Sequence, residues 1–94
     1  MEQLIRDWAH ARNLIEGSTP QAQMLKLTEE VGELARAIAK NKPDDAKDAI
    51  GDCGVVLIIL AAMQGLTLHE CLEAAYEQIK DRKGRMVNGV FVKE

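Results

Sequence analysis

The sequence predicts an all-α protein: a four-helix bundle with a short hairpin-like C-terminal tail. Apolar residues recur at helical spacing in four segments, and capping residues, prolines and glycines separate these segments. The alternation typical of strands occurs only near the C-terminus. With 94 residues, 47% of them hydrophobic, the chain fits one folded domain covering 1–94.

The first helix is expected over residues 2–16, because Gly17 and Ser18 then interrupt the helical pattern. Its apolar face consists of Leu4, Ile5, Trp8, Ala11 and Ile15.

The second helix is expected to begin after Thr19 as N-cap, with Pro20 in its first turn, and to run to about Lys40. Its apolar stripe consists of Met24, Leu27, Val31, Leu34 and Ile38.

The third helix is expected to begin at Asp44 or Asp45, after the break at 41–43, and to end at about Gln64. Residues 53–63 are apolar on every side, and a helix of this kind must be covered all round. We therefore expect self-association, with this helix near the subunit interface. The alternative is a central helix wrapped by its own chain.

Thr67 and Glu70 form a capping box that opens the fourth helix, expected to run to about Lys83. Residues 87–92 resemble two very short strands about an Asn-Gly turn. The inward face of the fourth helix is expected to consist of Leu68, Cys71, Leu72, Ala75 and Ile79.

Composition argues against several classes of protein. A net charge of −3 gives no general electrostatic reason for binding nucleic acid. The longest apolar run, 53–63, is too short for a membrane span, and the N-terminus lacks the layout of a secretory signal. Cys53 and Cys71 form no C-x-x-C pair, which favours a reduced compartment. We expect a soluble cytoplasmic domain without nucleic-acid or membrane partners.

Acidic residues on the second and third helices are the strongest signal for function. Glu29, Glu30 and Glu33 share one helix face, and Asp48 and Asp52 lie four residues apart on the third helix. The short loop predicts antiparallel packing of the two helices. Since both sets are equally distant from the loop centre, we expect all five carboxylates at the same level.

Carboxylates gathered at one level repel one another, so a cation is expected among them. Oxygen ligands suit Mg²⁺, Mn²⁺ or Ca²⁺, and Mg²⁺ commonly bridges to phosphate oxygens. Gly32 and Gly51 are expected to let the two backbones approach closely beside this site. The alternative is a solvated acidic face, paired with nearby basic residues. These are Lys26, Arg36 and Lys47.

A basic cluster of Lys80, Arg82, Lys83 and Arg85 lies at the end of the fourth helix. Such residues are also typical of a helix C-terminus. Beside a carboxylate metal site, they suggest a phosphate clamp that folds over it. The only aromatic residues are Trp8, Tyr76 and Phe91, each of which could stack on a nucleobase or fill the core.

Residues 26–34, with Glu29-Glu30-Val31-Gly32-Glu33 inside, and Ile50-Gly51-Asp52 resemble the MazG-like nucleotide pyrophosphohydrolases. The signature of this all-α group is E-E-x-x-E, a spacer, then E-x-x-D. The resemblance covers most of the chain. It implies a MazG fold, a homo-oligomer (dimer or tetramer), Mg²⁺ dependence with Mn²⁺ as a substitute, and hydrolysis of a nucleoside triphosphate to the monophosphate and pyrophosphate.

Carried over by position, the resemblance gives Glu30, Glu33 and Asp52 as metal ligands. The remaining family glutamate falls at Ala49, so we expect the adjacent Asp48 to take its role. The expected catalytic residues are Glu30 and the extra acid Glu29, which would hold a second ion or orient the attacking water.

Substrate contacts follow less directly, because Tyr76 and Gln78 stand where larger family members have an Asn and a Lys. Arg82 matches a basic family position. The expected substrate-binding set is Trp8, Lys26, Lys80, Arg82, Lys83 and Arg85. Two alternatives stay open: a non-catalytic helical module with an acidic docking face, and a hydrolase of another nucleotide phosphoanhydride.

Overall fold

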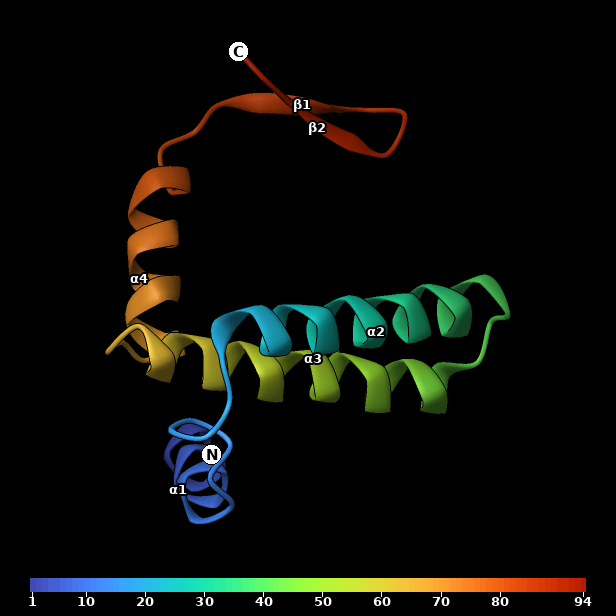
Figure 1. Cartoon of the computed structure of the whole chain (residues 1–94). Helices are drawn as coiled ribbons and strands as arrows, with labels where there is room; N and C mark the ends of the chain where they lie inside the picture. Colours follow the sequence, from blue (N-terminus) through green and yellow to red (C-terminus); the bar gives the residue numbers. More distant parts are fainter.

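The computed structural model describes residues 1–94 as four helices followed by an antiparallel two-stranded hairpin (Figure 1). This confirms the all-α class and the order of the elements. The elements are α1 (Glu2–Ala11), α2 (Pro20–Ala39), α3 (Pro43–Met63), α4 (Leu68–Ile79), β1 (Gly84–Val87) and β2 (Val90–Lys93).

Two helices begin with the caps that the sequence predicts. The Thr19 hydroxyl accepts a hydrogen bond from the backbone N–H of Ala22, and Pro20 occupies the first turn of α2. At the start of α4, Thr67 and Glu70 form the complete capping box. These bonds satisfy backbone donors that a helix N-terminus otherwise leaves unpaired.

The first helix ends at Ala11, earlier than the predicted Glu16, because Asn13 adopts a left-handed conformation with φ 58°. The backbone N–H of Leu14 then bonds to the carbonyl of Ala9, which is the Schellman arrangement. Asn41 and Gly65 form the same pattern two residues beyond the ends of α2 and α3. At the end of α1, Asn13 therefore takes the role that the sequence analysis gave to Gly17.

The fourth helix also ends earlier than predicted, at Ile79 and not near Lys83. The chain then enters a hairpin that begins at Gly84, three residues before the predicted strand. A side chain at Gly84 would come within 2.3 Å of the Val92 carbonyl oxygen, so this position requires glycine. Asn88 and Gly89 form the predicted two-residue turn, both with positive φ.

The helices α2 and α3 lie side by side and antiparallel, and the other elements attach to this pair (Figure 1). The first helix crosses the pair on one side, whereas α4 leaves the end of α3 at 95° and carries the hairpin on the opposite side. No helix alone has the length and hydropathy to cross a membrane; α3 and α4 meet this criterion only as a bent pair.

One chain does not close the predicted four-helix bundle. Its radius of gyration is 15.7 Å, whereas a compact chain of this length has about 12 Å. The buried apolar residues are few: one lies in α1, one in α2 and five in α3. They are Ala9, Ala37, Ala49, Val56, Ile58, Ile59 and Ala61.

The apolar stripe predicted for α2 is only partly directed to the core. Gln23, Glu30 and Ala37 are the buried residues of α2. Leu27 and Leu34 are half-buried, whereas the other members of the predicted stripe are exposed. Those residues are Met24, Val31 and Ile38, which keep 49%, 51% and 64% of their surface. The helix therefore has two apolar sides, and only one is covered.

The rest of the chain covers the later helices only in part. Of residues 53–63 in α3, Val56, Ile58, Ile59 and Ala61 are buried within the chain and the others keep part of their surface, so the expected self-association of this helix stays a prediction. No residue of α4 is buried, and Leu72 and Ile79, predicted to point inward, are exposed. The reason is that α4 meets the rest of the chain only at its N-terminal end.

That end is held by Glu2 of α1. Its carboxylate accepts hydrogen bonds from the backbone N–H groups of Leu68 and His69 and pairs with Arg6. Burial acts to raise the pKa of Glu2, but the two backbone donors and the Arg6 guanidinium outweigh it and lower the pKa. A carboxylate at a helix N-terminus is favourable because it meets unpaired donors and the positive end of the helix dipole.

We predict that Glu2→Gln loosens the junction between α1 and α4. A neutral amide is a weaker acceptor, so backbone amide exchange at Leu68 and His69 should become several-fold faster. Because the folded-state pKa of Glu2 is lowered, its contribution is complete above the ordinary value of 4.5 and is lost as the pH falls through the folded-state value. The parent should therefore lose protection on acidification, and Glu2→Gln should respond little.

The matched control is Glu77→Gln, which removes a charge from the exposed surface of α4 at the end away from Leu68 and His69. Unchanged exchange at Leu68 and His69 in Glu2→Gln would show that the carboxylate does not hold this junction.

Candidate functional site

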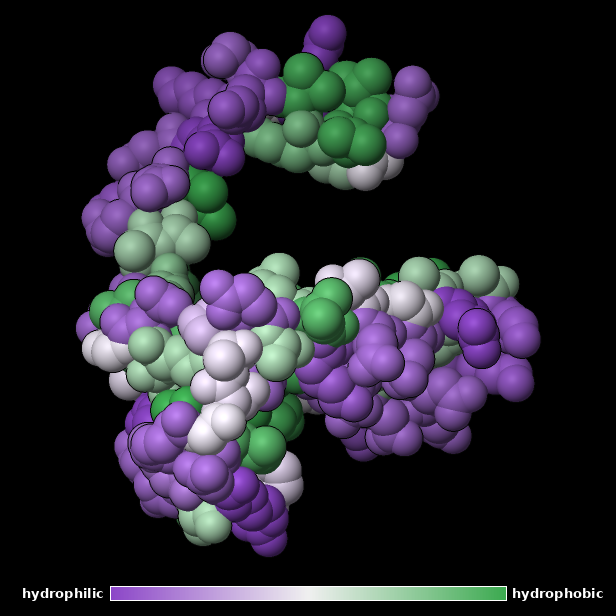
Figure 2. All heavy atoms as spheres, viewed as in Figure 1, coloured by the Kyte–Doolittle hydropathy of each residue, from purple (hydrophilic) through white to green (hydrophobic).

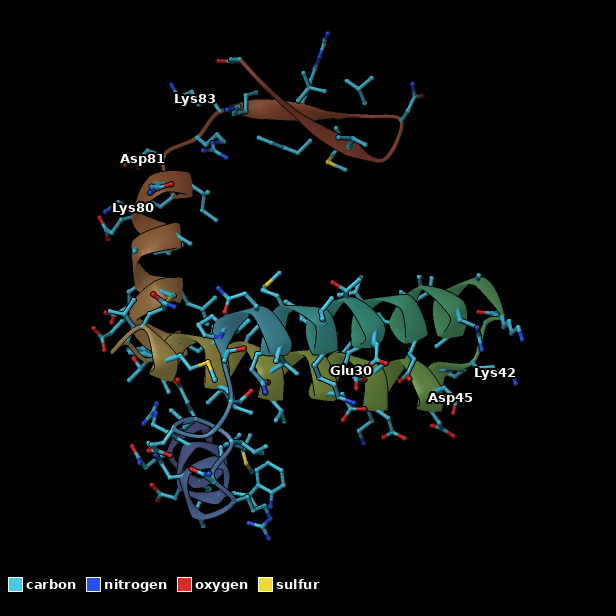
Figure 3. The ribbon with its side chains drawn as sticks, viewed as in Figure 1. Glu30, Lys42, Asp45, Lys80, Asp81 and Lys83 are labelled. Atoms are coloured by element: carbon cyan, nitrogen blue, oxygen red, sulfur yellow. The ribbon has the colours of Figure 1, made fainter.

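Three acidic side chains from α2 and α3 come together at one level, as Figure 3 shows for the region around Glu30. Glu30 and Glu33 project from adjacent turns of α2, and Asp52 projects from α3. One carboxylate oxygen from each lies within 4.8 Å of the other two. Glu30 is buried, whereas Glu33 and Asp52 are exposed. These three side chains, which we call the acidic group, lie at the edge of the contact between the helices.

Glu30 has an incomplete set of partners. Its Oε1 accepts from the Nζ of Lys26 at 3.2 Å, while its Oε2 is buried without any hydrogen-bond partner. Hydrogen bonding to Glu30, and the charges of Glu30, Glu29 and Glu33, raise the pKa of Lys26. Lys26 therefore stays protonated, yet it satisfies only one of the two oxygens of Glu30.

An apolar cavity of about 590 Å³ opens beside these acids, between α1 and the α2–α3 pair. Trp8 forms part of its wall and is 43% exposed, so it is not the core residue that its spacing would also allow. The lining residues are Leu4, Ile5, Trp8, Lys26, Glu30, Asp52, Val55 and Val56.

Arg12 also belongs to this region, although the sequence analysis did not select it. Its guanidinium lies 4.6 Å from the centre of the Trp8 ring. The spacing of four residues on α1 was the available signal, because side chains four apart meet on a helix. Arg12 contacts Trp8 but does not itself line the cavity.

Two other predicted acids lie outside the acidic group. Glu29 is exposed and its Oε2 lies 3.8 Å from the Nζ of Lys26. Asp48 is exposed, one helical turn before Asp52 on α3. Ala49, which lies between Asp48 and Asp52 in the sequence, is buried. The position of the missing family glutamate therefore faces the interior. Participation of Asp48 in metal binding stays a prediction.

The glycines predicted to bring the backbones together do not do so. A Cβ added to Gly32 or to Gly51 would meet nothing within 4 Å. Both residues are exposed. Gly51 lies one residue from Asp52 and Gly32 two residues from Glu30, so they are turned by about 100° and 200° around their helices, away from the contact. The prediction of a close approach at these positions was wrong.

The predicted clamp residues do not reach the acids within one chain. Lys80 pairs with Glu77 at 2.9 Å, and Arg82 and Lys83 line a separate polar hollow at the base of the hairpin. Figure 3 shows Lys80 beside the end of α4 and Lys83 beyond it, both on the side of the α2–α3 pair opposite α1. Arg85, in β1, is exposed in the same region. In a single chain the acidic and basic groups are separate.

The residues present fit a divalent cation with oxygen ligands. Three carboxylates provide the hard donors that Mg²⁺ and Mn²⁺ prefer, and the unpartnered Oε2 of Glu30 lacks the positive partner that a buried oxygen requires. No cysteine is among them, and the acidic group contains no histidine. These features favour magnesium-type chemistry over zinc or iron.

Comparison with known proteins identifies the family of this chain. The MazG nucleotide pyrophosphohydrolase domain matches residues 18–87. An uncharacterized 18.2 kDa protein in the rep-hol intergenic region of Haemophilus phage HP1 (strain HP1c1) is 59% identical over 64 residues. That match covers 65% of this chain and 39% of the phage protein, so the chain matches well under half of the relative's length. No solved structure matches. The family match spans α2, α3, α4 and β1, so the chain belongs to the MazG nucleotide pyrophosphohydrolase domain family.

Proposed function

We propose that this protein is a Mg²⁺-dependent nucleoside triphosphate pyrophosphohydrolase. Water would cleave the anhydride between the α- and β-phosphates, releasing a nucleoside monophosphate and pyrophosphate. The observation that carries the proposal is the buried, unpartnered Oε2 of Glu30 inside a group of three carboxylates. Membership of the MazG family supplies the reaction class.

In this proposal Glu30, Glu33 and Asp52 hold the cation, and Asp48 can contribute a fourth oxygen from the adjacent turn of α3. A bound Mg²⁺ or Mn²⁺ supplies charge neutralisation for phosphate oxygens and lowers the pKa of coordinated water. Glu29, exposed beside the group, accepts the proton of the attacking water. Because Glu30 is buried, it would fix the position of the cation relative to Glu33 and Asp52.

The cavity would receive the nucleoside. Trp8 offers a ring face for stacking on the base, and Val55 and Val56 provide apolar wall. Lys26 stands between the cavity and the acids, so its ammonium is placed to contact a phosphate oxygen. The clamp residues Lys80, Arg82, Lys83 and Arg85 would stabilise the pyrophosphate leaving group if they were brought to the site.

We further propose that 1–94 acts as one domain within a cytoplasmic homo-oligomer. The uncovered apolar residues of α2 and α4 support self-association. The biological role would be control of nucleotide pools. Hydrolysis of another nucleotide phosphoanhydride would use the same site. A non-catalytic acidic docking face would not need the cavity beside Trp8.

We predict that Glu33→Gln and Asp52→Asn each lower pyrophosphate release by at least about 100-fold, because even outer-shell partners of a catalytic metal are worth about 10–100-fold. The assay measures pyrophosphate and monophosphate from a panel of ribo- and deoxyribonucleoside triphosphates with Mg²⁺, Mn²⁺ or EDTA. Asp45→Asn, an exposed acid at the start of α3 outside the group, is the matched control.

Asp48→Asn belongs in the same series. A loss comparable to that of Asp52→Asn would assign Asp48 the role left vacant at Ala49, while full activity would remove it from the site. If the folded parent releases no pyrophosphate from any triphosphate, the proposed reaction is wrong, and the other phosphoanhydrides become the substrates to test.

Metal binding should also stabilise the fold. At a Mg²⁺ concentration about 100 times its Kd, ligand linkage predicts about 2.7 kcal/mol, which raises the Tm of a small domain by several degrees. Glu30→Gln should raise the Tm in EDTA, since it removes a buried charge, and should abolish the gain from Mg²⁺. The measurement is thermal denaturation at constant ionic strength. Equal stabilisation by Mg²⁺ and by monovalent salt would indicate a docking face instead.

We predict that Trp8→Leu raises KM by about tenfold with a smaller change in kcat, because base stacking is worth about 1–3 kcal/mol. Leu25→Ala, at an exposed position of α2 outside the cavity, is the control. An unchanged KM would mean that the base does not stack on Trp8.

A further inference from the structure

The tryptophan in the cavity wall is covered on one side by a cation. The Arg12 guanidinium carbon lies 4.6 Å from the centre of the Trp8 ring. Because side chains on a helix lean toward its N-terminus, Arg12 covers the turn before its own, which carries the indole. Trp8 lines the cavity, whereas Arg12 does not. The part of the ring that faces the cavity is therefore not the part that Arg12 covers.

The early end of α1 creates the place for this guanidinium. In a regular helix the Trp8 carbonyl accepts a hydrogen bond from the backbone N–H four residues later, which is that of Arg12. Because α1 ends at Ala11, the Arg12 N–H bonds to the Ala9 carbonyl at 3.3 Å instead. The Trp8 carbonyl accepts from Nη1 of Arg12, also at 3.3 Å. One guanidinium therefore bonds to the backbone of Trp8 and lies over its ring.

No carboxylate competes with Trp8 for this arginine. Arg12 makes no ion pair, although residues 2–16 contain three acids. Each of these acids is engaged by a different side chain. The pairs are Glu2 with Arg6, Asp7 with Gln3, and Glu16 with His10. The charge of Arg12 is therefore directed to the ring.

Trp8 itself is only partly packed. It keeps 43% of its surface, and Figure 2 shows hydrophobic atoms left visible where α1 meets the α2–α3 pair. An indole in such a place can rotate about its side-chain torsions. Ordering a side chain costs free energy when a partner binds, so an indole that is already held binds a flat ligand more tightly.

We propose that Arg12 is a positioning residue for the substrate: it holds the Trp8 indole by one face and leaves the cavity side of the ring for a nucleobase. This inference rests on the proposed function, in which a base stacks on Trp8. Arg12 touches neither the base nor the phosphates and acts only through the ring. The order of the stack is guanidinium, indole, base.

Arginine suits this position better than lysine. A guanidinium is planar, so it stacks on an aromatic face while its N–H groups donate to a neighbouring acceptor. A lysine ammonium keeps the positive charge but has no flat surface. The Arg12→Lys variant should therefore keep part of the hold on Trp8, and Arg12→Met should lose it.

Pyrophosphate-release kinetics of Arg12→Met test the inference, because methionine keeps an apolar stem and removes the guanidinium. The KM for nucleoside triphosphates should rise by about three- to fivefold with little change in kcat, which is the worth of an exposed cation–π contact. Arg12→Lys should recover part of the loss. Arg36→Met, at an exposed position of α2 without an ion pair, is the matched control and should keep the parent's KM.

A second substitution separates positioning from other roles of Arg12. In a Trp8→Leu background, Arg12→Met should leave KM unchanged, since Arg12 acts only through the ring. An equal rise of KM in both backgrounds would show that Arg12 contacts the substrate or supports α1 in another way, and it would overturn the inference. Any contribution of Arg12 to the stability of α1 is recorded separately, as a change in Tm that persists in the Trp8→Leu background.

The emission of Trp8 provides a measurement without turnover, because Trp8 is the only tryptophan in the chain. The parent and Arg12→Met are titrated with α,β-methylene-ATP and Mg²⁺, after the fluorescence anisotropy of each free protein is recorded. We expect a lower anisotropy of the indole in Arg12→Met and about three- to fivefold more nucleotide for half-maximal quenching. Equal anisotropy and equal titrations, or no quenching in the parent, would overturn the inference.

The two readouts separate this inference from the proposed function. An active parent whose Arg12→Met variant keeps the parent's KM overturns the role of Arg12 and leaves the hydrolase intact. A parent that releases no pyrophosphate overturns the proposed function. The fluorescence titration then decides whether Arg12 holds Trp8 for a base.

Discussion

The rest of this structure depends on how the charge of Glu30 is balanced, because its carboxylate lies in the contact between α2 and α3 with one oxygen unpartnered. An ionised carboxylate that loses its water costs several kcal/mol unless it is paired and hydrogen-bonded. Lys26 pairs with one of the two oxygens, but the lysine is half-exposed and solvent screens its attraction to Glu30. Two further acids at the same level add repulsion. A bound divalent cation would relieve both costs. The arrangement of charges therefore suits a bound cation and destabilises the chain without one.

The sequence predicts this site because helical period and loop length are local properties. Glu30 and Asp52 face each other since both lie equally far from a loop that Asn41 closes with a left-handed residue. The same reasoning fails for Gly32 and Gly51, which satisfy the same numerical match. A match along the helix axis fixes only the level of a residue, and its direction around the helix depends on which face is buried. That face contains Gln23 and Glu30 as well as apolar residues.

Long-range features are less accessible to such reasoning. The end of α1 at Ala11 depends on Asn13 adopting φ 58°, which asparagine tolerates but does not require. The direction of α4 depends on Glu2, 66 residues earlier in the chain, whose carboxylate bonds to Leu68. No spacing rule links two such positions. For this reason the basic residues after α4 could be recognised as phosphate-binding candidates, while their place on the far side of the α2–α3 pair could not.

The openness of the chain follows from the two unlike faces of the α2–α3 pair. A helix pair with acids on one face and apolar residues on the other cannot bury both faces against its own short neighbours. Covering the acidic face with the chain's own basic residues after α4 would require α4 to turn back past α1, which occupies that side and builds the cavity wall with Trp8. Sending them outward on α4 leaves the cavity intact. The basic residues after α4 therefore stay apart from Glu30, Glu33 and Asp52 within one chain.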